Sequence, residues 1–350
     1  MRSNKFLLVF LSIFLTFFAS DCSFQNFLLK KNIQSNQNRV GCLVFLPWDD
    51  DWNQFMYPKE KAVQAMNMIE KSGIKWVRMD FSRTKIEPTK NQYNYKQFDW
   101  LVEELHKRDI SILGVLGYSP PWASQNGQWN SPPTDLRGFG KYIFETVGRY
   151  KGKVDYWEIW NEPNHNDYWQ PQGDLSVYVQ LLKEAYLAAK SANPKSVVLN
   201  GALAEANAED LRKLYQLGAK DYFDIVNVHL IDITMRSQDL KRDITNKIVK
   251  IKNMIKQFHD EKKRIWITEI GYPGIPQLNE SDLNSEQKQA NVLLEVMATA
   301  INNDVDLIFW AFFQDTKKFF NKNGIDYFGL VRSDFTQKPS FDKLEQWMNR

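Results

Sequence analysis

The stretch RIWITEI at residues 264–270 is a largely apolar run, with isoleucine or tryptophan at four of its seven positions and a single glutamate, Glu269. A second run, VVLNGAL at residues 197–203, has the same nearly continuous apolar character. A strand with one face in water alternates apolar and polar residues, whereas a strand of a parallel sheet covered by helices is apolar on both faces. These two runs therefore predict buried strands of a parallel sheet.

Further apolar runs have the length of strands, and helical patterns separate them. The predicted strands lie at residues 41–46, 76–81, 110–118, 154–161, 197–203, 225–230, 264–270 and 307–313. The predicted helices lie at residues 59–72, 95–107, 135–150, 175–192, 208–217, 240–259, 285–302 and 340–348. Asp174 predicts a helix N-cap, and Asn193 before Pro194 predicts a helix end. This strict alternation predicts an α/β fold, a single-domain (β/α)8 TIM barrel.

The composition of the 350 residues excludes several classes of function. A hydrophobic fraction of 43% and a charged fraction of 25% are typical of a globular protein, so wholesale disorder is excluded. The net charge of +3 is too balanced for a protein that mainly binds nucleic acid. Two cysteines cannot form a Cys-rich zinc site, and no glycine-rich phosphate loop follows a strand. We therefore expect no metal and no cofactor.

The pattern at the N-terminus predicts an export signal. Arg2 and Lys5 precede the apolar run FLLVFLSIFLTFFA at residues 6–19. A membrane-spanning helix needs about 20 residues, so this run is short for an anchor and fits a secretory signal peptide.

The resulting division of the chain is a signal peptide at 1–22, a polar linker at 23–39 and the barrel domain at 40–350. Cys22 offers a lipoprotein attachment site as an alternative, to which the preceding Asp21 is a poor match. We expect a secreted or cell-envelope protein with no stable membrane insertion after signal cleavage.

Two carboxylates end predicted strands. Glu162 follows the strand at 154–161, and Glu269 lies at the end of the strand at 264–270. Active sites of (β/α)8 barrels lie at the carboxyl ends of their strands. Two carboxylates facing each other across a sugar-sized gap are sufficient machinery for cleaving a glycosidic bond. The alternative is that each glutamate is a salt-bridged residue at the barrel rim, and Asn161 beside Glu162 favours the functional interpretation.

Several strand ends carry motifs of a known group of enzymes. The stretches WEIWNEPN at 157–164 and WITEIGY at 266–272 resemble the acid/base and nucleophile strands of clan A glycoside hydrolases. The segments WVRMDF at 76–81, YSPPWA at 118–123 and WAFFQD at 310–315 look like those of compact family 39-like members. The resemblance extends over nearly the whole chain after the signal peptide.

The resemblance implies a retaining glycoside hydrolase that acts on β-linked oligo- or polysaccharides by double displacement. Glu162 would be the general acid and then the general base, and Glu269 the nucleophile. Asn161 would bind the 2-hydroxyl of the sugar, and Trp310 would form the floor of its site.

Two further polar residues end predicted strands. Arg78 is the candidate cation that keeps Glu269 ionised while Glu162 stays protonated. Its alternative role is that of a buried structural partner for Glu158 or Asp80. His229 ends the strand at 225–230, where it either orients a hydroxyl or Glu269 or is simply a satisfied strand-end residue.

Aromatic residues make up 14% of the chain, so some are available to line a cleft as well as to pack the core. Indole and phenol rings pack against the apolar faces of sugars. The candidates at loops and strand ends are Tyr118, Trp122, Trp160, Trp169 and Trp310. Three other tryptophans lie within strands, and we expect them to pack against helices: Trp76, Trp157 and Trp266.

Rival functions remain at this point. A carbohydrate-binding barrel without catalysis would keep the fold and the aromatic cleft, but it would need neither Glu162 nor Glu269. An aldolase would need a strand-end lysine for a Schiff base, and no predicted strand ends in one. The identity of the glycan, endo or exo action and the oligomeric state stay open.

Overall fold

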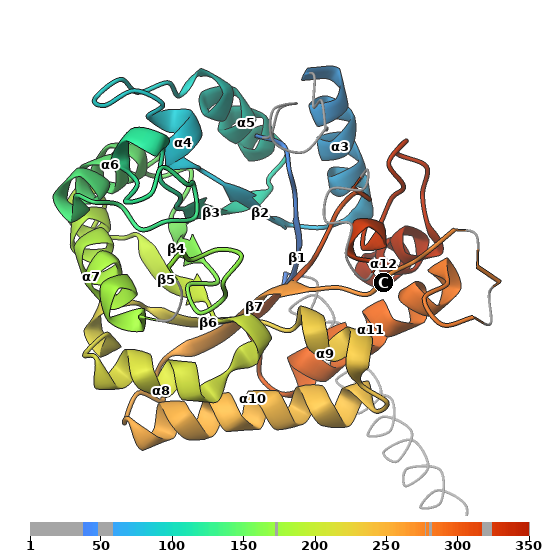
Figure 1. Ribbon diagram of the computed structural model, residues 1–350. Coiled ribbons are helices and arrows are strands. Elements are labelled where there is room, and N and C mark those ends of the chain that lie inside the picture. The colour runs from blue at the N-terminus through green and yellow to red at the C-terminus, as the bar shows by residue number, and fades with distance from the viewer. Residues whose placement is uncertain are drawn as a thin grey trace, which may run out of the picture.

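The computed structural model describes residues 38–47, 59–171, 174–276, 278–279, 282–316 and 324–349. Eight parallel strands, β1 to β8 in chain order, form a closed barrel, and helices surround it (Figure 1). The predicted (β/α)8 barrel is therefore confirmed. The predicted signal peptide and Cys22 lie outside the described residues. Within the described part of the chain, no helix has the length and apolar character needed to cross a membrane.

The strands pair in sequence order. Their bounds are β1 Val40–Leu43, β2 Trp76–Asp80, β3 Ser111–Leu116, β4 Tyr156–Asn161, β5 Val197–Ala202, β6 Ile225–His229, β7 Arg264–Ile270 and β8 Leu307–Trp310. The barrel closes where β1 pairs with β8, with Val40 opposite Ile308. Most strands end earlier than predicted, and the differences are largest for β1, β3 and β8, which end at Leu43, Leu116 and Trp310. The chain leaves the sheet at these points to form the loops above the barrel.

The helices lie between the strands as predicted. The longer ones are α3 Lys59–Ser72, α5 Lys96–Lys107, α6 Leu136–Arg149, α7 Leu175–Ala192, α8 Ala208–Gln216, α10 Leu240–Gln257, α11 Glu286–Asn302 and α12 Pro339–Met348. Asp174 caps α7 by accepting a hydrogen bond from the backbone N–H of Ser176, and α7 ends at Asn193 as predicted. Two short helices were not predicted, α4 Arg83–Ile86 after β2 and α9 Ile231–Arg236 after β6.

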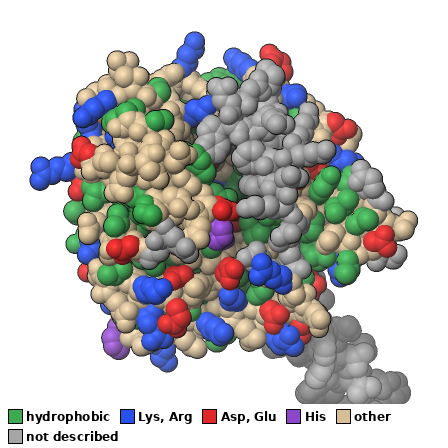
Figure 2. Space-filling model, in the orientation of Figure 1, with side chains coloured by type: hydrophobic (Ala, Val, Ile, Leu, Met, Phe, Trp, Pro, Cys, Tyr) green, Lys and Arg blue, Asp and Glu red, His purple; other side chains and the backbone are tan. Residues whose placement is uncertain are grey.

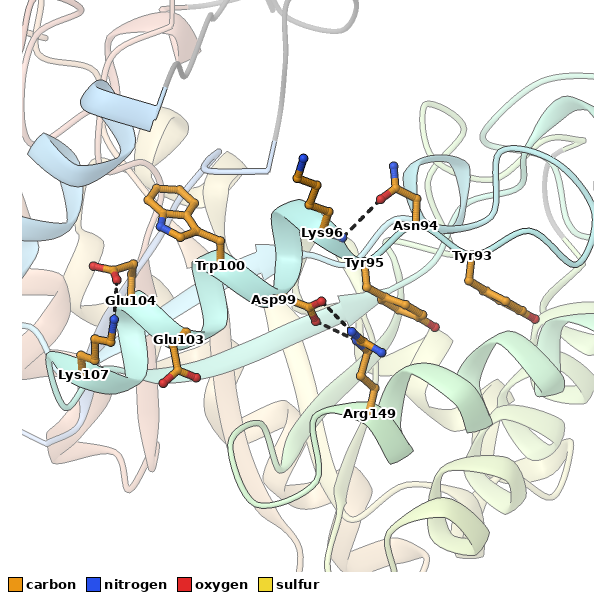
Figure 3. A pocket seen from close by; sticks show the side chains of 10 residues that line it. All are labelled: Tyr93, Asn94, Tyr95, Lys96, Asp99, Trp100, Glu103, Glu104, Lys107 and Arg149. Carbon is orange, nitrogen blue, oxygen red and sulfur yellow. Dashed lines mark hydrogen bonds and ion pairs between the residues drawn. The ribbon is translucent and has the colours of Figure 1, made fainter.

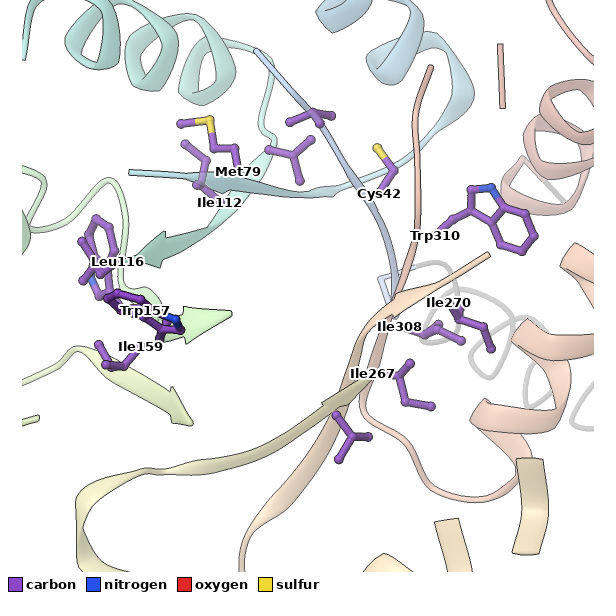
Figure 4. Packing of buried hydrophobic residues seen from close by; sticks show 14 of the residues in the cluster. Cys42, Met79, Ile112, Leu116, Trp157, Ile159, Ile267, Ile270, Ile308 and Trp310 are labelled. Atoms are coloured by element: carbon purple, nitrogen blue, oxygen red, sulfur yellow. The ribbon is translucent and has the colours of Figure 1, made fainter. Parts of the chain in front are cut away.

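The main hydrophobic core lies between the strands and the surrounding helices. Figure 4 shows part of it, with Ile267 and Ile308 opposite each other on the neighbouring strands β7 and β8 and Ile159 on β4 across the barrel. Trp157 belongs to this core, as predicted, and packs edge-on against Phe81. Burying apolar surface contributes about 25 cal/mol per Å², so this layer supplies most of the stability of the fold.

A second, smaller core fills the inside of the barrel. The rings of Trp76, Tyr156 and Trp266 contact one another, with centroids 5.0 to 5.5 Å apart. These residues come from β2, β4 and β7, which are not neighbours in the sheet, so they meet across the barrel interior. The prediction that Trp76 and Trp266 pack against helices is therefore wrong. Strands that are apolar on both faces do not reveal which face points inward.

This inner core leaves no room beside Gly41 on β1. A Cβ atom at Gly41 would lie 2.5 Å from the ring of Phe309 and 2.9 Å from the Cβ of Trp76. We expect Gly41→Ala to lower the free energy of unfolding by about 1–3 kcal/mol or more, because the rings have no space to move. Urea unfolding followed by tryptophan fluorescence measures this change.

Gly148 in α6 is the matched control. A Cβ atom there would meet only the Cβ of Ala192, at 3.8 Å, which is an ordinary contact. Gly148→Ala should raise the free energy of unfolding by about 0.5–1 kcal/mol because alanine favours the helix. Equal effects of the two substitutions would contradict the packing described for the barrel interior.

Candidate active site

The end of β4 departs from regular strand geometry. Trp160 has a φ of 69° and Glu162 a φ of 42°, both in the left-handed region that residues other than glycine seldom occupy. In a regular strand, successive side chains point to opposite faces. Here the consecutive residues Asn161 and Glu162 both reach partners on other strands, Arg78 and His229 respectively. The strained turn therefore delivers two polar side chains to one place.

The end of β7 shows a similar departure. The pairing of β7 with β8 shifts its register between Ile267 and Ile270, and the pairing with β6 shifts near His229. Thr268 contacts His229, while the next residue, Glu269, contacts Arg78. An irregularity of this kind re-aims side chains, and it is common next to active sites.

Arg78 on β2 holds three side chains together. Its Nε and Nη2 donate to the two oxygens of Glu158, at 2.7 and 3.0 Å. Its Nη2 also donates to Oδ1 of Asn161 at 2.7 Å, and its Nη1 donates to Oε1 of Glu269 at 2.6 Å. Both roles considered for Arg78, a cation beside Glu269 and a buried partner of Glu158, are therefore present at once. Glu158 is fully buried, and it also accepts from the backbone N–H of Ala202.

His229 connects the two strand-end glutamates. Its Nδ1 lies 2.7 Å from Oε1 of Glu162 and 3.8 Å from Oε2 of Glu269. The pKa of His229 is lowered to about 4, mainly by burial and in addition by the positive charge of Arg78, against the opposing effects of Glu269 and Glu158. The imidazole is therefore neutral at pH 7.

The two glutamates face the same small space. Their side chains are each 12% exposed, so both are reachable from solvent but mostly enclosed. Figure 2 shows acidic and histidine side chains together at a hollow near the centre of the face in view. Burial raises the pKa of Glu269, and the ion pair with Arg78 opposes this rise. Glu269 is thus the glutamate that has a cation beside it, whereas Glu162 has a neutral ring.

Glu162, His229 and Glu269 also form the one set of three among the described residues whose ligand atoms could hold a metal ion. These atoms lie within 4.8 Å of one another. All three groups are already engaged, since Glu269 pairs with Arg78, and Glu162 and His229 pair with each other. A guanidinium 2.6 Å from one carboxylate also repels a cation from the same place. The arrangement fits acid–base chemistry better than metal binding.

The aromatic residues proposed to bind sugar differ in their surroundings. Trp160 is fully buried against Tyr118 and Trp169, and its Nε1 donates to the carbonyl of Tyr168. Trp169 is 2% exposed and Tyr118 is 5% exposed. These contacts enclose Trp160 and Trp169 among other rings, and contact of Tyr118, Trp160 or Trp169 with a sugar stays a prediction.

The other two aromatic candidates lie on different sides of the site. Trp310 ends β8 and is fully buried, with its Nε1 donating to the carbonyl of Phe328 at 2.8 Å. Trp122 is 36% exposed, and its indole lies 4.9 Å from the guanidinium carbon of Arg83. Contact of either ring with a sugar stays a prediction.

Three residues of the site were missed from the sequence. Asn200, Asn227 and Thr268 are fully buried and hydrogen-bonded to one another or to His229. Each is a polar residue with apolar residues before it in a largely apolar strand, and this was the available signal. A buried polar side chain in a parallel strand needs a partner, so it marks a network inside the barrel.

A hollow of about 680 Å³ also lies along the outside of α5 (Figure 3). Its charged side chains pair with each other, as Arg149 does with Asp99 at 2.6 Å and Lys107 with Glu104 at 2.9 Å. None of the strand-end residues lines it. It is therefore separate from the site of the two glutamates.

A (β/α)8 barrel with one glutamate after β4, a second on β7 and an arginine on β2 is the arrangement expected from the resemblance to clan A glycoside hydrolases. The model of glycosyl hydrolase family 10 matches residues 74–346 of this chain. The chain belongs to this family. The expected clan A resemblance is thus confirmed.

Relatives and solved structures agree with this assignment. Endo-1,4-beta-xylanase 2 of Claviceps purpurea is 32% identical over 129 residues, which cover 34% of this chain and 37% of that protein. The fold is similar to that of a family 39 glycoside hydrolase from Bacteroides cellulosilyticus WH2, with a TM-score of 0.71 and 22% identity over 89% of this chain and 64% of that one. It is also similar to xylanase 10B of Thermotoga maritima, with a TM-score of 0.62 and 18% identity over 91% and 97%.

The comparisons differ in what they show about this chain. The likeness to the family 39 structure, at 22% identity, is one of fold. The matched segments span between 18% and 37% of the length of the first curated relatives. The activity and the substrates of these proteins are therefore not assigned to this chain by similarity alone.

The network around Arg78 leads to a prediction about stability. Arg78→Met leaves the carboxylate of Glu158 buried without its cation, which costs about 3–5 kcal/mol of unfolding free energy. The matched control is Arg149→Met, which breaks a pair with Asp99 whose side chains are 46% and 40% exposed. That change should cost at most about 1 kcal/mol. Urea unfolding at pH 7 measures both changes in unfolding free energy. Equal losses would show that the buried pair contributes no more to stability than the exposed pair.

Proposed function

We propose that this chain is a retaining glycoside hydrolase that cleaves β-O-glycosidic bonds in an oligo- or polysaccharide by double displacement. The observation that carries the proposal is the placement of Glu162 and Glu269, with carboxylate oxygens within 4.8 Å of each other. Retaining enzymes hold their two carboxyl groups about 5–5.5 Å apart, whereas inverting enzymes need about 6.5–9.5 Å to admit a water molecule between them.

The partners of the two glutamates support different roles for them. Glu269 pairs with Arg78, which favours its ionised form and suits it to be the nucleophile. In the first step, Glu269 attacks the anomeric carbon, the glycosidic C–O bond breaks, and the departing oxygen takes a proton from Glu162. In the second step, Glu162 takes a proton from water, and the water oxygen displaces Glu269 from the sugar.

Two neighbouring side chains are placed to assist this reaction. Asn161 is held by Arg78 beside Glu162, where its amide nitrogen can donate to a sugar hydroxyl. His229 contacts Glu162 at 2.7 Å, which fixes the position of the acid. Such positioning lowers the barrier because the reacting groups are already in place.

The substrate class follows from chemistry and relatives together. The relative from Claviceps purpurea is an endo-1,4-beta-xylanase, so we propose β-1,4-linked xylan and xylo-oligosaccharides as the first substrates. We also propose export through the N-terminal segment, on the ground that the apolar run at residues 6–19 is too short to span a membrane. Secretion would bring the enzyme to polysaccharides outside the cell.

A covalent label tests the nucleophile. An activated 2-deoxy-2-fluoro-xyloside should inactivate the enzyme and add the mass of one fluorosugar to the peptide that contains Glu269. The fluorine slows both steps because it destabilises their oxocarbenium-like transition states, and the activated leaving group speeds up only the first, so the glycosyl-enzyme accumulates. Glu269→Ala should lose about 10³-fold or more in kcat and should not be labelled. Peptide mapping by mass spectrometry reads the site, and a label on any other carboxylate would overturn this assignment.

The acid is tested with substrates of different leaving groups. Glu162→Gln should lose about 10²–10⁴-fold in kcat on xylo-oligosaccharides, because their leaving oxygen needs a proton. It should keep most of its glycosylation rate on an aryl xyloside whose leaving group departs unprotonated. The control is Glu286→Gln on α11, since Glu286 has the same 12% side-chain exposure but pairs with Arg332. An equal loss of rate on both substrates in Glu162→Gln would contradict the role of Glu162 as the acid. If the unsubstituted protein binds glycans but cleaves none of them, the alternative of a carbohydrate-binding barrel is favoured.

A further inference from the structure

The barrel interior below the two glutamates contains a continuous row of hydrogen bonds. It starts at Asn200 on β5, passes through Asn227 on β6 and Thr268 on β7, and reaches His229 and then Glu162. The first three of these side chains are fully buried, and His229 is 1% exposed. Buried polar groups of this kind must satisfy each other, so the direction of each hydrogen bond is determined by its neighbours.

Backbone groups anchor the row, because their donor and acceptor identities are fixed. The backbone N–H of Asn227 donates to Oδ1 of Asn200 at 2.9 Å, and Nδ2 of Asn200 donates to the backbone carbonyl of Asn227 at 3.0 Å. In return, Nδ2 of Asn227 donates to the backbone carbonyl of Asn200 at 3.3 Å. The Oδ1 of Asn227 therefore faces the other way, toward Thr268.

The directions of the next two hydrogen bonds follow from the single proton on the hydroxyl of Thr268. An amide oxygen can only accept, so the hydroxyl of Thr268 donates its single proton to Oδ1 of Asn227, at 2.8 Å. The Thr268 oxygen can then only accept from Nε2 of His229, which lies 3.0 Å away. His229 must therefore carry its proton on Nε2, which leaves a lone pair on Nδ1.

We propose that Thr268 and Asn227 are positioning residues that select the Nε2–H tautomer of His229 and thereby hold the acidic proton on Glu162. A neutral ring with its lone pair on Nδ1 can only accept from Oε1 of Glu162, at 2.7 Å, so the carboxyl group must supply the proton. The low pKa of His229, about 4, agrees with a neutral ring. The kinetic part of this inference rests on the proposed function, whereas the tautomer does not.

The charged and titratable groups around His229 and Glu162 act independently of the hydrogen bond from His229 to Thr268. The titratable and charged groups that act on His229 or Glu162 are Glu269 on β7, Arg78 on β2, Glu158 on β4 and Tyr168 in the loop after β4. Burial raises the pKa of Tyr168 well above its ordinary value, so this residue stays neutral. A substitution at Thr268 leaves all four groups in place, and its effect therefore reports the hydrogen bond alone.

The tautomer can be measured without any substrate. In the full chain labelled with ¹⁵N in its histidine rings, NMR distinguishes protonated from unprotonated ring nitrogens, and the His229 signals are assigned by their loss in His229→Asn. We expect the Nε2–H form between pH 5 and 8. The Nδ1–H form in the unsubstituted protein would overturn the inference directly, and this result needs no variant to fold.

Thr268→Val and Thr268→Ser form a matched pair of variants. Valine has the shape of threonine without the hydroxyl, so Nε2–H loses its acceptor and the His229 population should shift toward Nδ1–H. The alkaline limb of the kcat/KM profile on xylo-oligosaccharides should then move down by about one pH unit, the effect of one hydrogen bond of ordinary strength. Thr268→Ser keeps the hydroxyl and should keep both the tautomer and the profile.

An activated aryl xyloside separates this inference from the proposed function. Its glycosylation rate should be the same in Thr268→Val and in the unsubstituted protein, because that step needs no proton from Glu162. A merely structural role for Thr268 would lower both rates together, and an unchanged tautomer and alkaline limb in Thr268→Val would also overturn the proposal. If the unsubstituted protein cleaves no xyloside, the proposed function fails while the tautomer measurement still decides the role of Thr268.

Discussion

The candidate site depends on one buried cation. The guanidinium of Arg78 donates to Glu158, Asn161 and Glu269, and so it joins β2, β4 and β7 across the inside of the barrel. Burying a cation in this way is favourable only when its donors are matched by acceptors, and two carboxylates and an amide provide that match. Trp76, two residues earlier on β2, closes the interior below it. On the inner face of β2, Trp76 thus contributes apolar packing, and Arg78, two residues further along, contributes the buried charge.

Around this cation, the barrel must place two pairs of consecutive polar residues on one side. A regular strand cannot do so, because neighbouring side chains point to opposite faces. At β4, the positive φ angles of Trp160 and Glu162 turn two consecutive side chains to the same side. At β7, the shift in register does the same for Thr268 and Glu269, which both contact partners. Backbone strain of this kind costs about 1–3 kcal/mol per residue and persists only where its surroundings enforce it. The ion pairs of Arg78 are part of that enforcement.

These features explain what could be predicted from the sequence and what could not. The barrel and the strand-end glutamates follow from the alternation of apolar strands and helices, since that periodicity is local. The inward direction of Trp76 and Trp266 could not be predicted, because a strand such as 264–270 is apolar on both faces and carries no mark of its inner side. Asn227 and Thr268 look like ordinary polar interruptions until their partners on neighbouring strands are known. Such partners are set by register, which depends on pairing between segments far apart in the chain.

The two glutamates lie close together yet need opposite protonation states, and the same arginine contributes to both. Arg78 pairs with Glu269 and favours its negative charge. Burial first, and the positive charge of Arg78 in addition, lower the pKa of His229, which keeps that ring neutral. A neutral His229 whose Nε2–H is committed to Thr268 can only accept from Glu162, so the proton stays on this glutamate. One cation thus opposes the rise that burial causes in the pKa of Glu269, and it helps to keep the imidazole neutral beside the proton of Glu162.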